Sequence, residues 1–142
     1  MILLVTNVVS EPMRPVPDAR IGEWINSQPL DTLWLSAMTV AELRAGVALL
    51  PAGKRRTVLH ESLEQRILPL FEGRVLAFDM ACTNVYAQLT AKARAVGKVV
   101  ETADACIAAT ALVYGYAVAT RDAVPFQAAG VKVINPWKMK PA

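Results

Sequence analysis

Three carboxylates stand in segments that are otherwise mostly apolar or small. Glu42 lies in TVAELRAG, Asp104 in TADACIAAT and Asp122 in ATRDAVPF. Carboxylates that meet in one cleft repel one another, and a hard divalent cation such as Mg²⁺ or Mn²⁺ relieves that repulsion because it prefers oxygen ligands. Such an ion polarises a phosphodiester and deprotonates a water for in-line attack. The three acids therefore predict a metal-dependent site for phosphodiester hydrolysis.

Each acid also has a purely structural interpretation. Thr39 and Glu42 have the spacing of a capping box at a helix start. Asp104 suits the first turn of a helix because of the helix dipole, and Asp122 suits a turn. Taken one at a time, each acid favours the structural interpretation. Taken together, three acids at corresponding positions near the sheet edge favour a metal site. The sequence pattern alone leaves both interpretations open.

Other kinds of site are excluded by residue counts. The single His60 rules out a two-histidine metal site, and we expect it on a helix surface. Cys82 and Cys106 form neither a CxxC pair nor a zinc pattern, so we expect buried thiols in a reducing compartment.

The net charge of +3 permits a nucleic-acid partner without requiring one. Basic side chains near the acids would hold a phosphate backbone. The candidates are Arg44, Arg121, Lys54, Arg55 and Arg56. The last three would equally suit a solvated helix start.

Apolar runs alternate with helical patterns along the chain. Strands are predicted at residues 1–5, 32–37, 74–78, 116–119 and 131–134, and helices at 18–27, 39–50, 54–68, 82–96 and 102–114. The segment from Glu11 to Pro17 holds three prolines and is predicted to be an extended surface arm.

This alternation predicts parallel strands joined by right-handed crossovers. We therefore expect an α/β fold, a three-layer α/β/α sandwich around a parallel five-stranded sheet, with residues 1–142 as a single domain. Glu42, Asp104 and Asp122 should gather at the edge formed by the carboxyl ends of the strands, where open α/β sheets bind ligands.

Composition excludes several classes of protein. The chain has 142 residues, 54% of them apolar, which argues against disorder and suits a sheet covered on both faces or a large partner interface. Trp24, Trp34 and Trp137 could serve that interface, although Trp24 and Trp34 also suit a core. Neither a membrane span nor a signal peptide is expected, so we predict a cytoplasmic protein.

Several segments, in order along nearly the whole chain, resemble PIN-domain toxins of the VapC family, in particular its FitB-like branch. They are MILLVTNVVSEPMRP, LSAMTVAELRAGVALL, LHESLEQRILPLF, ETADACIAATA, ATRD and VINPW. The resemblance implies an Mg²⁺- or Mn²⁺-dependent endoribonuclease with an RNA substrate. It also implies a cognate antitoxin, a homodimer, and contact with operator DNA only through the antitoxin.

The same resemblance assigns metal and catalytic roles to Glu42, Asp104 and Asp122. It also implies a fourth acid, an aspartate followed by Thr-Asn at the end of the first strand. This chain has Val5 there, before Thr6 and Asn7, and Glu11 is too far along to substitute. Many relatives carry a further acid shortly after the position of Asp122, where Val124 and Pro125 stand here.

Val5 offers no ligand oxygen. One charge pair at about 4 Å is worth roughly 4 kcal/mol at an effective dielectric constant of about 20, before desolvation. Losing even half of that would weaken metal binding more than about tenfold. We therefore expect a folded PIN domain with little or no nuclease activity. The alternative is a binding protein that has lost catalysis and acts with its antitoxin, as an antitoxin sink or a co-repressor.

Overall fold

A computed structural model describes residues 1–139. Its centre is one sheet of five parallel strands in the order β3-β2-β1-β4-β5. The strands are β1 (Ile2–Leu4), β2 (Leu33–Ser36), β3 (Val75–Leu76), β4 (Ala117–Ala119) and β5 (Val133–Ile134). The predicted parallel five-stranded sheet is confirmed.

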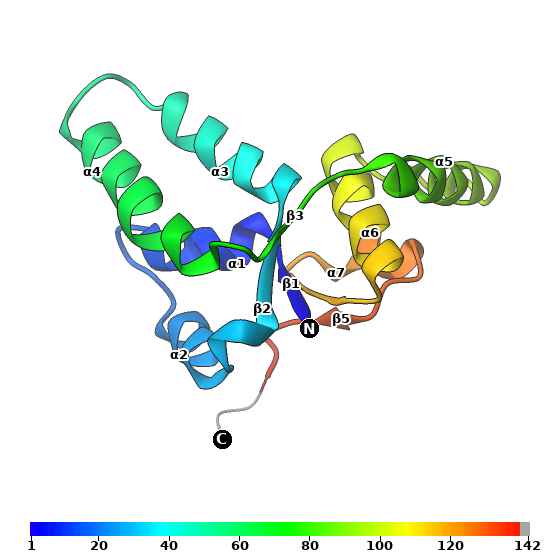
Figure 1. The fold of residues 1–142 in the computed structure, drawn as a ribbon, viewed down its shortest axis with the longest axis horizontal. Coiled ribbons are helices and arrows are strands. Elements are labelled where there is room, and N and C mark those ends of the chain that lie inside the picture. Colours follow the sequence, from blue (N-terminus) through cyan, green and yellow to red (C-terminus); the bar gives the residue numbers. More distant parts are fainter. Residues whose placement is uncertain (140–142) are drawn as a thin grey trace.

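Helices cover both faces of this sheet. They are α1 (Thr6–Ser10), α2 (Ala19–Ser27), α3 (Ala37–Ala48), α4 (Lys54–Ser62), α5 (Met80–Ala95), α6 (Thr102–Tyr114) and α7 (Ala123–Ala128). Helices α1 to α4 lie on one side and α5 to α7 on the other (Figure 1), which gives the three expected layers. No helix within residues 1–139 has the length and apolarity needed to cross a bilayer.

The alternating side chains of β1 explain why both faces need cover. Leu3 packs in the cluster formed with α5, α6 and α7, whereas Leu4 packs in the cluster formed with α1, α2 and α3. In β4, Val118 likewise packs in the first of these clusters and Ala119 in the second. Because successive strand residues point to opposite faces, Val5 shares the face of Leu3.

The predicted extended arm is wrong at its start. Glu11–Met13 forms a 3₁₀ turn directly after α1, and Glu11 is only 4% exposed. Its carboxylate accepts hydrogen bonds from the Arg14 guanidinium and from the Asp18 N–H. Prolines exclude a long helix, but Pro12 is tolerated near the start of a short turn, where its missing N–H has no partner to lose.

Some helix limits also differ from the prediction. The helices α1 and α7 were not predicted, since five or six residues are too few to show a helical period. The helix expected over residues 54–68 changes at Leu63–Ile67 to π geometry and ends as a 3₁₀ turn at Leu68–Phe71. Residues 77 and 78 fall outside β3, and Asp79 caps α5 by accepting from the Cys82 N–H.

The cysteines and two tryptophans pack as core residues. Cys82 and Cys106 are free and buried, as predicted. Trp24 and Trp34 are partly buried against opposite sides of the sheet, which supports core packing for both. Trp137 is also partly buried and packs against the same cluster as Trp24.

Candidate functional site

Three elements bring the candidate acids toward one edge of the sheet. Glu42 is on α3, which starts directly after β2, and Asp122 lies three residues beyond the end of β4. Asp104 is in the first turn of α6. Because α6 returns the chain to the amino end of β4, its own first turn lies at the carboxyl edge.

The pKa of Asp104 is shifted by its surroundings and by the other two acids. Partial burial raises the pKa of its carboxyl group above the ordinary value, and the negative charges of Glu42, Asp122 and Glu101 raise this pKa further. Glu42 and Asp122 thus both act on Asp104 through space. Across residues 1–139, no three histidine, cysteine, aspartate or glutamate side chains are arranged as a metal-binding cluster. The acids share a neighbourhood without forming a closed ligand set.

Glu42 is held by a side chain that sequence reasoning did not single out. The Thr6 hydroxyl donates to Glu42 Oε1 at 2.7 Å, across 36 positions of sequence. The capping-box interpretation of Glu42 is wrong, because α3 begins earlier. Ser36 is its N-cap, and Ser36 Oγ accepts from the Thr39 N–H at 3.1 Å. The one signal in the sequence that could have indicated Thr6 is its place next to Val5, where the family resemblance implies an aspartate.

Asp122 occupies the N-cap position of α7, but its side chain makes no capping hydrogen bond. Its backbone N–H instead donates to Thr120 Oγ1 at 3.1 Å. The side chain is exposed and borders a cavity of about 440 Å³ that Asp104 also lines. Both carboxylates are therefore accessible from one opening.

The rest of that cavity comes from the α5–α6 connection and from α7. Its remaining lining residues are Lys98, Val99, Val100, Glu101, Val124, Pro125 and Ala128. Apart from the two candidate acids, the wall thus combines one ammonium group and one further carboxylate with an apolar surface.

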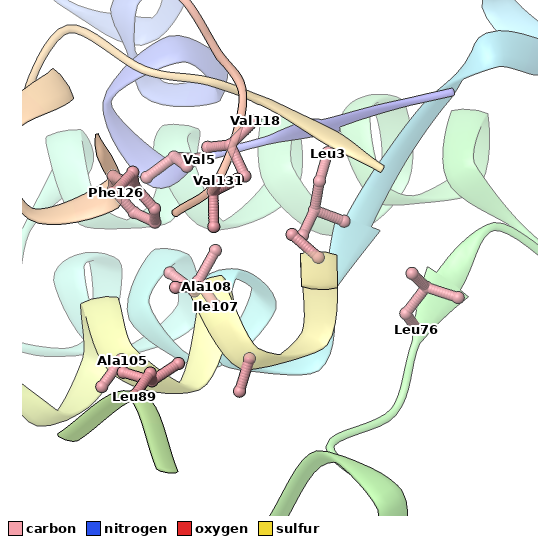
Figure 2. Packing of buried hydrophobic residues seen from close by; sticks show 12 residues of the cluster. Leu3, Val5, Leu76, Leu89, Ala105, Ile107, Ala108, Val118, Phe126 and Val131 are labelled. Atoms are coloured by element: carbon pink, nitrogen blue, oxygen red, sulfur yellow. The ribbon is translucent and has the colours of Figure 1, made fainter. Parts of the chain in front are cut away.

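Val5 lies directly after β1 and is 5% exposed. Its N–H donates to the Ala119 carbonyl at 3.0 Å, which continues the pairing with β4. Figure 2 shows the Val5 side chain beside Phe126, in the apolar cluster that also holds Val118 and Val131. No oxygen is supplied from this position.

The candidate basic residues do not form one group. Arg121 adjoins Asp122, and its guanidinium lies over the Trp137 ring at 5.3 Å from the centroid. Arg44 instead pairs with Glu64 at 2.8 Å and lowers the pKa of that carboxyl.

Lys54, Arg55 and Arg56 begin α4 on its exposed surface, at the far end of the α3–α4 hairpin (Figure 1). His60 is also exposed on α4, as predicted. A cavity of about 540 Å³ between α3 and α4 is lined by Arg44, Arg56 and His60, among others, and by none of the three candidate acids.

Comparison with known proteins identifies the family. The model of the PIN domain matches residues 2–132, which is most of the chain. The chain belongs to the PIN-domain family. The family resemblance stated from the sequence motifs is thereby confirmed.

Among curated proteins, this PIN-domain chain is 62% identical over 138 residues to the plasmid stability protein StbB of Pseudomonas syringae pathovar tomato. It is 56% identical over 137 residues to the toxin FitB of Neisseria gonorrhoeae and 53% identical over 138 residues to the VapC ribonuclease Y4jK of Sinorhizobium fredii. Each alignment covers at least 96% of this chain and 99% of the relative.

Solved structures agree with the sequence relatives. The structure of FitAB bound to an IR36 DNA fragment is similar with a TM-score of 0.94, 52% identity and 99% coverage of both chains. The structure of FitAcB from Neisseria gonorrhoeae also has a TM-score of 0.94, at 55% identity, with 98% of this chain and all of that chain covered. VapBC-1 of nontypeable Haemophilus influenzae, at 24% identity and a TM-score of 0.75 over 97% of this chain and all of that one, shares the fold.

Proposed function

We propose that this PIN-domain protein is the toxin of a toxin–antitoxin system and that its fold is built for Mg²⁺- or Mn²⁺-dependent cleavage of RNA phosphodiesters. We further propose that Val5 leaves this form inactive or weakly active. The observation that carries the proposal is the position of Glu42, Asp104 and Asp122 at one edge of the sheet, where Asp104 and Asp122 line the same cavity. The raised pKa of Asp104, due to burial and to the charges of Glu42 and Asp122, is consistent with this placement. Relatives more than half identical in sequence, named as a VapC ribonuclease and a toxin, support it.

The chemistry of the donor set suits a hard divalent cation. Glu42, Asp104 and Asp122 provide only oxygen atoms, and their mutual repulsion favours a positive charge among them. A bound Mg²⁺ would supply Lewis-acid polarisation of the phosphodiester and a more acidic water. We assign the metal to these three side chains, with the fourth ligand lost at Val5.

The protein's own side chains would do the remaining work. Thr6 orients Glu42 by hydrogen bonding to Oε1, which leaves Oε2 for another contact. Arg121 would hold substrate phosphate, since it adjoins Asp122 and is exposed. Arg44 has a weaker claim to RNA contact because Glu64 already neutralises it.

The test compares this chain with its Val5→Asp variant. Both are incubated with structured RNA and Mg²⁺ or Mn²⁺, and the cleavage rate is measured. We expect the variant to cleave at least about tenfold faster, as the estimated loss of metal affinity implies. A Val5→Asp, Glu42→Gln double variant controls for contaminating nuclease and should be inactive. Equal cleavage by this chain and Val5→Asp would refute the role of position 5.

A second candidate function is antitoxin binding without catalysis, with operator DNA contacted through the antitoxin. It is favoured by the apolar packing of Val5 and by similarity to FitAB captured on a DNA fragment. Calorimetric titration with Mg²⁺ separates the two functions. Micromolar binding supports residual catalysis, and no binding supports the partner-only role.

We also propose the remaining partner features that follow from the resemblance. The protein forms a homodimer in the cytoplasm, and an arginine of the antitoxin enters the acidic cleft to pair with Glu42, Asp104 and Asp122. Sedimentation velocity tests the dimer. Unchanged antitoxin affinity after Glu42→Gln would contradict the arginine contact.

A further inference from the structure

We infer that Asn7 and Asn135 are positioning residues that hold the turn carrying Asp122 from two sides. This inference rests on the proposed function, because it concerns how one candidate metal ligand is aimed. It is carried by hydrogen bonds from Asn7 and Asn135 to the backbone of a single residue, Arg121.

The sheet order makes this arrangement possible. Strand β4 lies between β1 and β5, and residues 120–122 follow β4. Asn7 follows β1 and Asn135 follows β5. Each asparagine therefore approaches the turn from a different flank, at the same edge of the sheet.

Both polar groups of the Arg121 backbone are taken up by these amides. The Arg121 N–H donates to Asn7 Oδ1 at 3.3 Å. Asn135 Nδ2 donates to the Arg121 carbonyl at 3.3 Å. The two peptide groups that flank Arg121, directly before Asp122, are thus held from both sides.

A second set of bonds reaches Asp122 itself. Asn7 Nδ2 donates to Thr120 Oγ1 at 3.3 Å, and the same buried oxygen accepts the Asp122 N–H at 3.1 Å. The Thr120 N–H donates to the Ile134 carbonyl at 3.0 Å, which ties the turn to β5. Since the Asp122 side chain makes no capping bond, its direction depends on this backbone.

The residue type matters because both ends of each amide are used. Asn7 accepts from Arg121 and donates to Thr120, while Asn135 donates to Arg121 and accepts from the Trp137 N–H at 3.0 Å. At either position a carboxylate of the same shape would lose the donated bond, and an alanine would lose both bonds of that residue.

The first measurement uses the metal-free full chain. Backbone ¹⁵N relaxation of Asp122 is recorded for this protein, Asn7→Ala and Asn135→Ala, with Asn84→Ala as a matched control on the exposed surface of α5. We expect the Asp122 amide to become mobile in the first two variants and to stay rigid in the control. An Asp122 amide as rigid in both variants as in the parent would overturn the inference.

The second measurement uses Mn²⁺ alone as the probe, in the Val5→Asp background. We expect Asn135→Ala to weaken Mn²⁺ binding on the order of tenfold, the usual effect of removing a group that orients a ligand. The same change in a Val5→Asp, Asp122→Asn background should have no further effect, because Asn135 acts through the Asp122 carboxylate. A tenfold loss that persists without that carboxylate would indicate a general structural role and overturn the inference.

The two proposals fail in different ways. If Val5→Asp neither binds Mn²⁺ nor cleaves RNA, the proposed function fails. The positioning role of Asn7 and Asn135 then fails with it, even if the Asp122 amide becomes mobile in their alanine variants. If Val5→Asp is active and its Mn²⁺ affinity is unchanged by Asn135→Ala, only the positioning role fails.

Discussion

Val5 lies directly after β1 and contributes two methyl groups to the apolar cluster. Its neighbour Phe126 is buried, and the face it shares with Leu3 is apolar (Figure 2). A carboxylate in this buried place would lose hydration. The valine therefore favours folding at the position where the proposed function expects a ligand oxygen.

Replacing Val5 with Asp should destabilise the metal-free protein, by on the order of 2 kcal/mol, because a buried polar group loses its hydration. Mg²⁺ should recover much of this, since a ligand at about 100 times its Kd stabilises the folded state by about 2.7 kcal/mol. Thermal denaturation with and without Mg²⁺ measures both effects. Val5→Asn is the matched control and should be destabilised without recovery. Equal recovery in both variants would contradict a ligand role for the carboxylate.

Asp104 should make stability depend on pH in an unusual direction for a carboxyl group. Its pKa is raised in the folded state, so the folded protein holds this proton more tightly than the unfolded chain does. The contribution of Asp104 to stability is present below its ordinary pKa and is lost as the pH rises through the raised value. Asp104→Asn should therefore raise the Tm at neutral pH, and the gain should shrink on acidification. A gain that is constant from pH 7 to below the ordinary pKa would contradict this.

At the scale of elements, α3 connects the sheet to the site. It begins immediately after β2, and Ser36 belongs to both the strand end and the helix cap. Glu42 then lies less than two turns into the helix, close enough to accept from Thr6 of α1. This short junction between strand and helix restricts the positions that the Glu42 carboxylate can occupy.

Removing the cap of α3 should cost stability. Ser36→Ala deletes the oxygen that accepts from the Thr39 N–H in a buried setting, so we expect a loss of about 1 kcal/mol or somewhat more. Urea denaturation measures it. Ser27→Ala, at the exposed end of α2, removes a hydroxyl bonded to a carbonyl and should change stability by less than about 0.5 kcal/mol. Similar losses in the two variants would contradict a stabilising contribution from the Ser36 cap.

At the scale of the whole molecule, the basic side chains are spread over separate regions. Arg121 lies at the acid edge, whereas Lys54, Arg55 and Arg56 stand at the tip of the α3–α4 hairpin. Helix α3 has 12 residues and so carries the chain about 18 Å from its start. The acid edge and the hairpin tip are therefore separate candidate regions for phosphate contact.

The salt dependence of RNA binding can test for a phosphate contact at Arg121. Because we propose that this form cleaves weakly, binding can be measured by fluorescence anisotropy without loss of substrate. Arg121→Ala should reduce the slope of log K against log salt by about 0.7, the value for one phosphate contact on a single strand. Lys132→Ala is the control, since it precedes β5 and lies at the opposite edge of the sheet. Equal reductions in both variants would contradict a specific contact at Arg121.

Sequence by itself determined the fold class, because apolar runs alternate with helical periods, and this order favours parallel pairing through helical crossovers. It also determined which chemistry was available, since one histidine and two isolated cysteines leave carboxylates as the candidates for a metal site. It identified the exceptional residue too, because Val5 stands beside Thr6 and Asn7 in an otherwise matching motif.

Tertiary structure alone decided how these side chains are held. The bond from Thr6 to Glu42 and the two asparagine bonds to Arg121 join residues from separate strands and helices. Short helices such as α1 and α7 were also beyond the sequence, because their stability comes from packing rather than from a repeated pattern. Periodicity reports which face of an element is buried, but the partner across the sheet edge is set by strand order, and strand order emerges only when the whole chain has folded.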